Sequence, residues 1–180
     1  MAINKQSIKL YTPTSQDACV VFDILKLAMI ELLDDLFGYD HLNTFKFFFN
    51  DNQTRFSKQN ICCAKVDENI VAAMCSYGGK DALMLDDKMN QYLKQYNKQL
   101  KCECLQDEYY LDSIAVQENY RGNGIFKVLM HQCFDLAKAN GYKKISLLAK
   151  NPKIYTAFGF EIVEEFELYN EKYFKMIKLI

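Results

Sequence analysis

The hydrophobic and polar pattern of the first fifty residues predicts one short strand and two helices. Residues 7–12 have a strand-like pattern, which Pro13 ends. Thr14 and Asp17 match a helix-capping pattern, and apolar residues then recur at helical spacing through Leu36, which predicts one long amphipathic helix. A second helix is predicted over residues 42–49.

The middle of the chain predicts a hairpin followed by a third helix. Residues 61–66 and 70–77 have strand patterns joined by Asp67-Glu68-Asn69, and Gly78-Gly79 marks the exit. Apolar residues between positions 81 and 104 recur at helical spacing. We expect this helix to pack on the sheet, and the alternatives are that it covers the entrance of a functional site or forms a surface for a partner.

Residues 109–130 change from a strand pattern to a helix pattern across two glycines, Gly122 and Gly124. The first amides of such a helix have no intrahelical partners, and the helix dipole adds positive charge there. The glycines let the backbone approach a phosphate, and Arg121 adds a fixed charge. These properties suit a pyrophosphate, and a plain tight turn is the alternative that the glycine pair alone leaves open.

The last third predicts a helix, a strand and a final strand pair. Asn140-Gly141 ends the helix that follows the glycine turn. Residues 144–149 read as a strand, and residues 161–168 and 173–180 form a pair around the polar turn Asn170-Glu171-Lys172. Strands and helices of this kind in one chain predict an α+β fold.

Composition limits the partners and the location of the protein. A chain of 180 residues that is 50% hydrophobic predicts a single domain over residues 1–180. A net charge of −1 argues against nucleic acid or an anionic membrane as partner. The start of the chain lacks the apolar core of a signal peptide, and no run approaches the roughly 18 apolar residues of a membrane span. We expect a soluble, cytoplasmic protein.

The seven cysteines stand mostly inside apolar runs and are interpreted as core residues in a reducing compartment. One residue separates Cys102 from Cys104, whereas a zinc knuckle has two. His131 has no carboxylate or cysteine partner at a catalytic spacing. We expect no metal site.

Two phosphate-binding families do not fit the glycine turn. A P-loop ends in Gly-Lys-Ser/Thr, and a dinucleotide fingerprint needs glycine or alanine where Lys127 stands. The turn instead closely resembles the Arg/Gln-x-x-Gly-x-Gly/Ala signature of the GNAT superfamily of N-acetyltransferases, which follows a strand ending in an apolar-x-Val run. The matching residues are Ile114-Ala115-Val116 and then Arg121-Gly122-Asn123-Gly124-Ile125-Phe126.

A second motif supports this resemblance. Asn151, Tyr155 and Gly159-Phe160 follow the order of the family's Asn…Tyr-x-x-x-Gly-Phe segment. The intervening part is shorter than usual, so the helix carrying Tyr155 should be brief. The resemblance covers about residues 60–175. Its departure is Phe126, where the family usually has glycine or alanine, so the ring must point into the core.

The resemblance implies the GNAT fold, in which helices flank a central, mixed, mostly antiparallel and twisted sheet in an α/β/α arrangement. It also implies acetyl-CoA as co-substrate and acyl transfer to a primary amine by direct attack. Ile114, Ala115 and Val116 would contact the pantetheine arm along a bulged strand, with the Ile114 amide near the thioester oxygen. Amides from Gly122 through Phe126 would hold the pyrophosphate, and Asn151 is assigned to the cofactor site. Arg121 would help there, or would pair with a local carboxylate.

Two side chains are expected to assist the transfer. Tyr155 occupies the position of the family tyrosine, which donates a hydrogen bond and then a proton to the departing sulfur. Tyr110 stands where the family often has a carboxylate, so Asp112 is the first candidate for base or amine anchor and Glu108 the second, both expected on the face of Tyr110. A water relay or an already neutral amine is equally compatible.

The sequence does not identify the acceptor amine. The acidic segment 34–40 is interpreted as a solvated helix end, with attraction for a cationic amine as the alternative. A second functional hypothesis is a catalytically weak CoA-binding or protein-interaction module on the same fold. It is suggested by Phe126, Tyr110 and the short Tyr155 segment. A homodimer is compatible with both.

Overall fold

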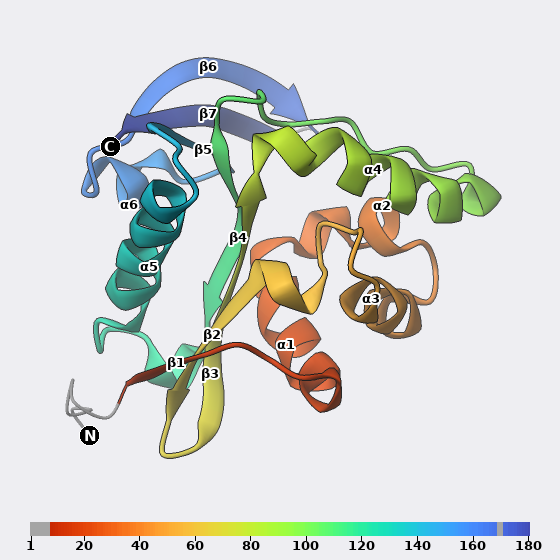
Figure 1. Cartoon of the computed structure of the whole chain (residues 1–180), viewed down its shortest axis with the longest axis horizontal. Coiled ribbons are helices and arrows are strands. Elements are labelled where there is room, and N and C mark those ends of the chain that lie inside the picture. Colours follow the sequence, from red (N-terminus) through yellow and green to blue (C-terminus); the bar gives the residue numbers. More distant parts are fainter. Residues whose placement is uncertain (1–7, 169–170) are drawn as a thin grey trace.

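The computed structural model describes residues 8–168 and 171–180, and its centre is a seven-stranded sheet in the order β1-β2-β3-β4-β5-β7-β6 (Figure 1). The β4–β5 pair is parallel and the other pairs are antiparallel. The strands are β1 (Lys9–Tyr11), β2 (Ile61–Val66), β3 (Asn69–Gly78), β4 (Tyr109–Val116), β5 (Lys144–Ala149), β6 (Glu161–Leu168) and β7 (Glu171–Leu179). The expected α+β fold with a mixed, mostly antiparallel sheet is confirmed.

Helices cover both faces of the sheet (Figure 1). One face carries α1 (Ala18–Leu25), α2 (Leu33–Phe37), α3 (His41–Asn50) and α4 (Gly79–Leu93). The other carries α5 (Ile125–Ala139) and the short α6 (Pro152–Thr156). In the described part of the chain, no helix combines the length and apolar character that crossing a bilayer requires.

The single long helix predicted after Thr14 is wrong, although its cap is present. Asp17 Oδ2 accepts hydrogen bonds from the Thr14 amide at 2.7 Å and from its hydroxyl at 2.8 Å. Helix α1 ends at Leu25, and two 3-10 turns precede α2. The helical backbone stops at Met29 (φ −139°, ψ 28°), whose buried side chain enters the core. Residues on both sides of this break, including Ala28 and Leu32, line a cavity of the candidate site described below.

Most of the remaining elements follow the predicted pattern, with two errors at their ends. The helix predicted within residues 81–104 ends at Leu93, and a 3-10 turn leads to Asn97 in the left-handed region (φ 57°). Glu171 and Lys172, which were predicted in the last turn, belong to β7. The β2–β3 hairpin turns through Asp67 and Glu68, both in the left-handed region (φ 48° and 65°). Helix α4 begins at Gly79, directly after β3 and earlier than predicted. Ser7 and Asn170, which were assigned to the first strand and the last turn, lie outside the described residues.

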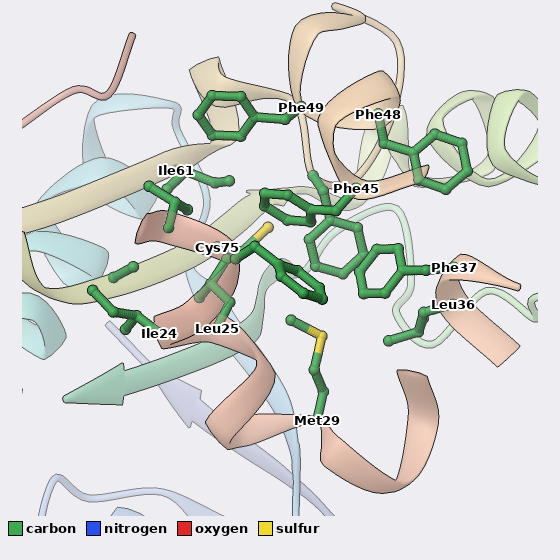
Figure 2. Close-up of a cluster of buried hydrophobic side chains, with 14 of the residues drawn as sticks. Ile24, Leu25, Met29, Leu36, Phe37, Phe45, Phe48, Phe49, Ile61 and Cys75 are labelled. Atoms are coloured by element: carbon green, nitrogen blue, oxygen red, sulfur yellow. The ribbon is translucent and has the colours of Figure 1, made fainter. Parts of the chain in front are cut away.

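The core on the α1–α4 face is a cluster of phenylalanine rings (Figure 2). The Phe45 ring lies 5.2 Å from Phe22 of α1, 5.6 Å from Phe37 of α2 and 5.5 Å from Phe49, measured between ring centroids. Helices α1, α2 and α3 thus meet at Phe45. Figure 2 also shows Met29 and Leu36 beside these rings, so the cluster fixes the segment that borders the site.

We predict that Phe45→Ala lowers the free energy of unfolding by about 3–5 kcal/mol, because it removes a fully buried ring. Phe47→Ala on the same helix is the matched control, since the Phe47 side chain is 49% exposed and its loss should cost about 1 kcal/mol. Urea unfolding of both variants measures the difference. Equal losses would show that the ring cluster does not dominate the stability of this face.

Candidate active site

Strand β4 contains a bulge and then separates from its neighbour. Ser113 pairs with Cys75 of β3 and Leu111 pairs with Ser76, so Asp112 is an additional residue that no β3 residue opposes. On the other side, β5 pairs only with residues 109–111 of β4. From Asp112 onward, the β5-facing edge of β4 therefore lies outside the ladder.

The direction of the β4 amides follows from one hydrogen bond at the end of the strand. The Gln117 amide donates to the Val71 carbonyl of β3 at 2.9 Å. Because amides alternate along a strand, the Ala115 amide also points toward β3, whereas those of Ile114 and Val116 point to the open edge. Two main-chain donors are thus available to a ligand, and Ala115 can take part only through its other atoms.

The glycine turn after β4 leads directly into α5. Gly122 (φ 77°) and Gly124 (φ 81°) both occupy the left-handed region, and Gly124 is the N-cap of α5. Arg121 Nε donates to the Val116 carbonyl at 3.2 Å, and no carboxylate among the described residues pairs with Arg121. The Asn123 amide group donates to the carbonyls of Tyr120 and Arg121 at 3.2 and 3.1 Å. These bonds hold the turn in shape from within.

Two adjoining cavities open along this edge. The first, which we call the turn cavity, has a volume of about 390 Å³ and is lined by Arg121, Gly122, Gly124, Ile125 and Phe126 together with residues 114–116. The second, the reaction cavity, has a volume of about 220 Å³ and is lined by Asp112, Asn151 and Tyr155, among others. Both are lined by Ala28, Ile114 and Ile154. Ile114 therefore stands where the two cavities meet.

Phe126 lies against α6 and does not fill the glycine turn. The ring is half-buried at the margin of the core, 6.1 Å from the Tyr155 ring and 5.8 Å from the Phe158 ring. Tyr155 also lies 6.1 Å from Phe160. Helix α6 has only five residues, as expected, so aromatic packing holds Tyr155 at the reaction cavity. Burial raises the pKa of Tyr155 to about 12.

Asp112 reaches the reaction cavity from the bulge. Its side chain is 9% exposed, and its Oδ2 lies 3.4 Å from the Tyr77 hydroxyl and 3.6 Å from Arg55 Nη1. Burial raises the pKa of Asp112 to about 7; the Arg55 cation opposes this rise and the Glu103 carboxylate adds to it. Asp112 can therefore exchange a proton near neutral pH.

Arg55 is a buried residue of the site that the sequence did not indicate. It lies in the polar segment between α3 and β2, and its side chain is 1% exposed. Its Nε donates to Asp86 of α4, its Nη1 to Glu103 at 3.2 Å and its Nη2 to the Lys101 carbonyl at 2.8 Å. An arginine among polar loop residues is normally exposed, so nothing local signals this burial.

Glu108, the second candidate base, borders neither cavity. It immediately precedes β4, which begins at Tyr109, so the expected alternation with Tyr110 does not extend to it. Its Oε2 accepts hydrogen bonds from the Leu105 amide at 3.0 Å and from the Ser146 hydroxyl at 2.8 Å, and lies 3.2 Å from Lys175 Nζ. These contacts give Glu108 a structural role.

The acidic side chains of residues 34–40, the histidines and the cysteines considered in the sequence analysis line neither of the two cavities. Asp34 lies 2.7 Å from His41 Nε2, and Asp35 lies 2.6 Å from Lys98 Nζ. These local pairs agree with the interpretation of the acidic segment as the end of a helix. The His131 ring packs on Phe134. Cys104 is buried, whereas Cys19 and Cys102 are exposed and do not belong to the core. Among the described residues, no three His, Cys, Asp or Glu side chains are placed so that they could hold a metal ion together.

Comparison with known proteins identifies the class to which this chain belongs. A family model described as the acetyltransferase (GNAT) family matches residues 26–160. The chain therefore belongs to the GNAT family of acetyltransferases, and membership implies acyl-CoA-dependent acetyl transfer. A comparison with curated proteins gives no match.

Solved structures show the same fold. An N-acetyltransferase from Staphylococcus aureus Mu50 is 24% identical, with a TM-score of 0.76 over 94% of this chain and 100% of that one. A second acetyltransferase is 22% identical, with a TM-score of 0.73 over 95% and 98%. A GNAT family acetyltransferase from Elizabethkingia anophelis, solved with acetyl-CoA bound, is 16% identical, with a TM-score of 0.55 over 98% and 100%.

Proposed function

We propose that this protein transfers an acetyl group from acetyl-CoA to a primary amine by direct attack. One observation carries the proposal: the turn cavity and the reaction cavity meet at Ile114, on the edge of β4 that β5 leaves open. A thioester placed at Ile114 has a phosphate-binding turn on one side and two ionisable side chains, Asp112 and Tyr155, on the other.

The chain offers suitable contacts for two parts of the cofactor, the pyrophosphate and the pantetheine arm. The amides at the start of α5, with the Arg121 charge beside them, suit the pyrophosphate. The amides of Ile114 and Val116 suit the pantetheine arm, because they have no partner in the sheet. The acetyl-CoA bound by the Elizabethkingia relative supports the same choice of co-substrate.

The transfer requires stabilisation of the charge that develops on the thioester oxygen. In this proposal, the Ile114 amide donates to that oxygen while the amine nitrogen attacks the carbonyl carbon and the carbon–sulfur bond breaks. A main-chain donor aimed in this way is typically worth about 3 kcal/mol. The donor is fixed in place by the pairing of β4 with β3, so it needs no rearrangement during the reaction.

Asp112 takes the proton of the attacking amine. A carboxylate of ordinary pKa is a weak base, but Asp112 has a pKa of about 7 because it is buried. The amine nitrogen becomes more acidic as its bond to carbon forms, so a base of this strength can accept the proton during the step. The proton then leaves to solvent through the open cavity.

Tyr155 assists the departing sulfur as a hydrogen-bond donor. The sequence suggested that it also supplies a proton, but a pKa of about 12 lies well above the roughly 8.5 of a thiol. Complete proton transfer from Tyr155 to the thiolate is therefore unfavourable. A hydrogen bond still lowers the energy of the leaving group in the transition state.

The weak-turnover module is the rival hypothesis, and the three features that suggest it are each compatible with catalysis. Phe126 packs on Tyr155, the short α6 still presents Tyr155 to the reaction cavity, and the Tyr110 hydroxyl donates to a carboxylate. Release of CoA with a panel of amines separates the two functions. Tight acetyl-CoA binding without turnover on any amine would favour the module.

We predict that Gly122→Ala weakens acetyl-CoA binding about tenfold, because relief of backbone strain displaces the amides of the turn. Gly141→Ala is a closely matched control, since both glycines have φ of 77° and at both an added Cβ meets no atom within 4 Å. Each variant should lose about 1–2 kcal/mol of stability. Calorimetric titration with acetyl-CoA measures the affinities. Equal affinities of the two variants would show that the turn does not bind acetyl-CoA.

We predict that Tyr155→Phe lowers kcat about 100-fold without changing acetyl-CoA affinity, because the ring remains and only the donor is lost. Tyr142→Phe is the control, since Tyr142 is a buried tyrosine that borders neither cavity. Turnover is measured under conditions where chemistry is rate-limiting. Unchanged turnover of Tyr155→Phe would show that Tyr155 does not assist the departing sulfur.

We predict that kcat rises with pH around a midpoint near 7, because the Asp112 base works only when deprotonated and is lost as pH falls. Asp112→Asn should lower kcat and abolish this rise. Asp87→Asn, which changes an exposed aspartate of α4, should preserve the profile. A rise that persists unchanged in Asp112→Asn would show that another group is the base.

A further inference from the structure

A third cavity borders the reaction cavity on the side away from the glycine turn. This outer cavity has a volume of about 540 Å³ and shares Leu32, Leu36, Glu103 and Leu148 with the reaction cavity. It shares no lining residue with the turn cavity. The reaction cavity therefore adjoins both, and with acetyl-CoA in the turn cavity, as in the proposed function, the outer cavity offers an acceptor an approach to the reaction cavity.

Glu103 is the only carboxylate, among the described residues, that lines both the outer and the reaction cavity. It belongs to the connection between α4 and β4, and its side chain is 29% exposed. The Tyr110 hydroxyl donates to its Oε2 at 2.6 Å, and Arg55 Nη1 donates to the same oxygen at 3.2 Å. Both donors are almost completely buried, so they hold the carboxylate at the junction.

The charges around this junction are unbalanced. Arg55 is one cation facing three carboxylates, those of Asp86, Glu103 and Asp112. Even with a proton on Asp112, the group has a formal charge of −1. Lys175 does not correct this, because its Nζ contacts Glu108 Oε2 and the main-chain oxygen of Glu103, each at 3.2 Å. A positively charged ligand would neutralise the remaining negative charge of this group.

The lining of the outer cavity indicates the rest of the ligand. Its apolar side chains are Leu32, Leu36, Leu100, Leu148 and Phe166. Asp35, another carboxylate of the lining, is paired with Lys98 at 2.6 Å. The lining also contains the carboxylate Glu164 and two cations, Lys101 and Lys175. Lys101 is exposed to solvent, and Lys175 Nζ already contacts Glu108 Oε2. Arg55 is engaged by its own partners, so a ligand carboxylate beside the amine would meet Glu103 as a like charge.

We propose that Glu103 binds the ammonium group of the acceptor, and that the acceptor is a primary amine with an apolar body and no carboxylate beside the amine. This inference rests on the proposed acetyl transfer. Glu103 positions the ammonium, which loses one proton to solvent water before the neutral amine attacks. Asp112 accepts the second proton as the carbon–nitrogen bond forms and the sulfur leaves as a thiolate, so the two carboxylates have separate roles. The amide product carries no charge and is held less tightly, which favours its release.

Hexylamine and 2-aminoheptanoic acid are a matched pair of probes, because they differ only by the carboxylate beside the amine. The wild-type protein is expected to acetylate hexylamine with kcat/KM at least about 100-fold higher. Equal use of the two compounds would overturn the proposed acceptor class while leaving the acetyl transfer intact. Failure to bind acetyl-CoA would instead overturn both the proposed function and this inference.

Glu103→Gln is expected to raise KM for hexylamine roughly tenfold to hundredfold and to leave acetyl-CoA affinity unchanged. The pH midpoint of kcat should shift to lower pH, because the Glu103 carboxylate contributes to the raised pKa of Asp112. Binding of the uncharged product N-hexylacetamide to the CoA complex should not change, a result that a merely structural role of Glu103 would not give. Glu161→Gln makes the same charge change at an exposed site of β6 and should leave KM unaltered.

If Glu103→Gln does not fold, Glu103→Asp retains the charge but withdraws it from the junction, and should raise KM for hexylamine by a smaller factor. If the protein binds acetyl-CoA but acetylates neither probe, the test is calorimetric titration of hexylamine into the CoA complexes of the wild type and the variant. The two hexylamine affinities are then compared. Unchanged hexylamine affinity or KM in the Glu103 variants would overturn the inference. Equal weakening of hexylamine and N-hexylacetamide would do so as well.

Discussion

The site depends on the point at which β4 stops pairing with β5. A parallel ladder that continued beyond Leu111 would satisfy the amides of Ile114 and Val116 and close the edge of the sheet. The bulge at Asp112 accompanies this separation and turns one carboxylate toward the opening. The donors, the cavities and the base of the proposed mechanism are therefore consequences of one interruption in a sheet that is otherwise continuous.

Arg55 and its three carboxylate neighbours, Asp86, Glu103 and Asp112, fix the position of this opening relative to the surrounding elements. The Arg55 guanidinium joins α4 through Asp86, the connection before β4 through Glu103, and the bulge through its approach to Asp112. Buried ion pairs of this kind are weak evidence for stability, because desolvation offsets their attraction. We attribute to Arg55 a mainly organising role: it holds three carboxylates in fixed positions, and it moderates the rise of the Asp112 pKa toward neutrality.

The parts of the site that the sequence predicted are those encoded by neighbouring residues. The strand-to-helix change across Gly122 and Gly124 located the turn, and the spacing from Asn151 to Phe160 located Tyr155. Glu103 and Arg55 could not be found in this way, because their roles arise from contacts with residues distant in the sequence. Arg55 contacts Asp86, which is 31 positions away, and Glu103, which is 48 positions away. A local sequence pattern cannot indicate such contacts. The helix break at Met29 was missed for a similar reason, since apolar periodicity does not show where tertiary packing interrupts a helix.

The packing of Phe126 on Tyr155 has a consequence for how this sequence can vary. A helix of five residues has too few internal hydrogen bonds to be stable alone, so the ring of Phe126 takes over part of the support of Tyr155. Replacing Phe126 with the glycine or alanine that the family usually has would leave the tyrosine without a neighbour on that side. The two positions form a coupled pair, and the residue common in relatives would be the disruptive one in this background.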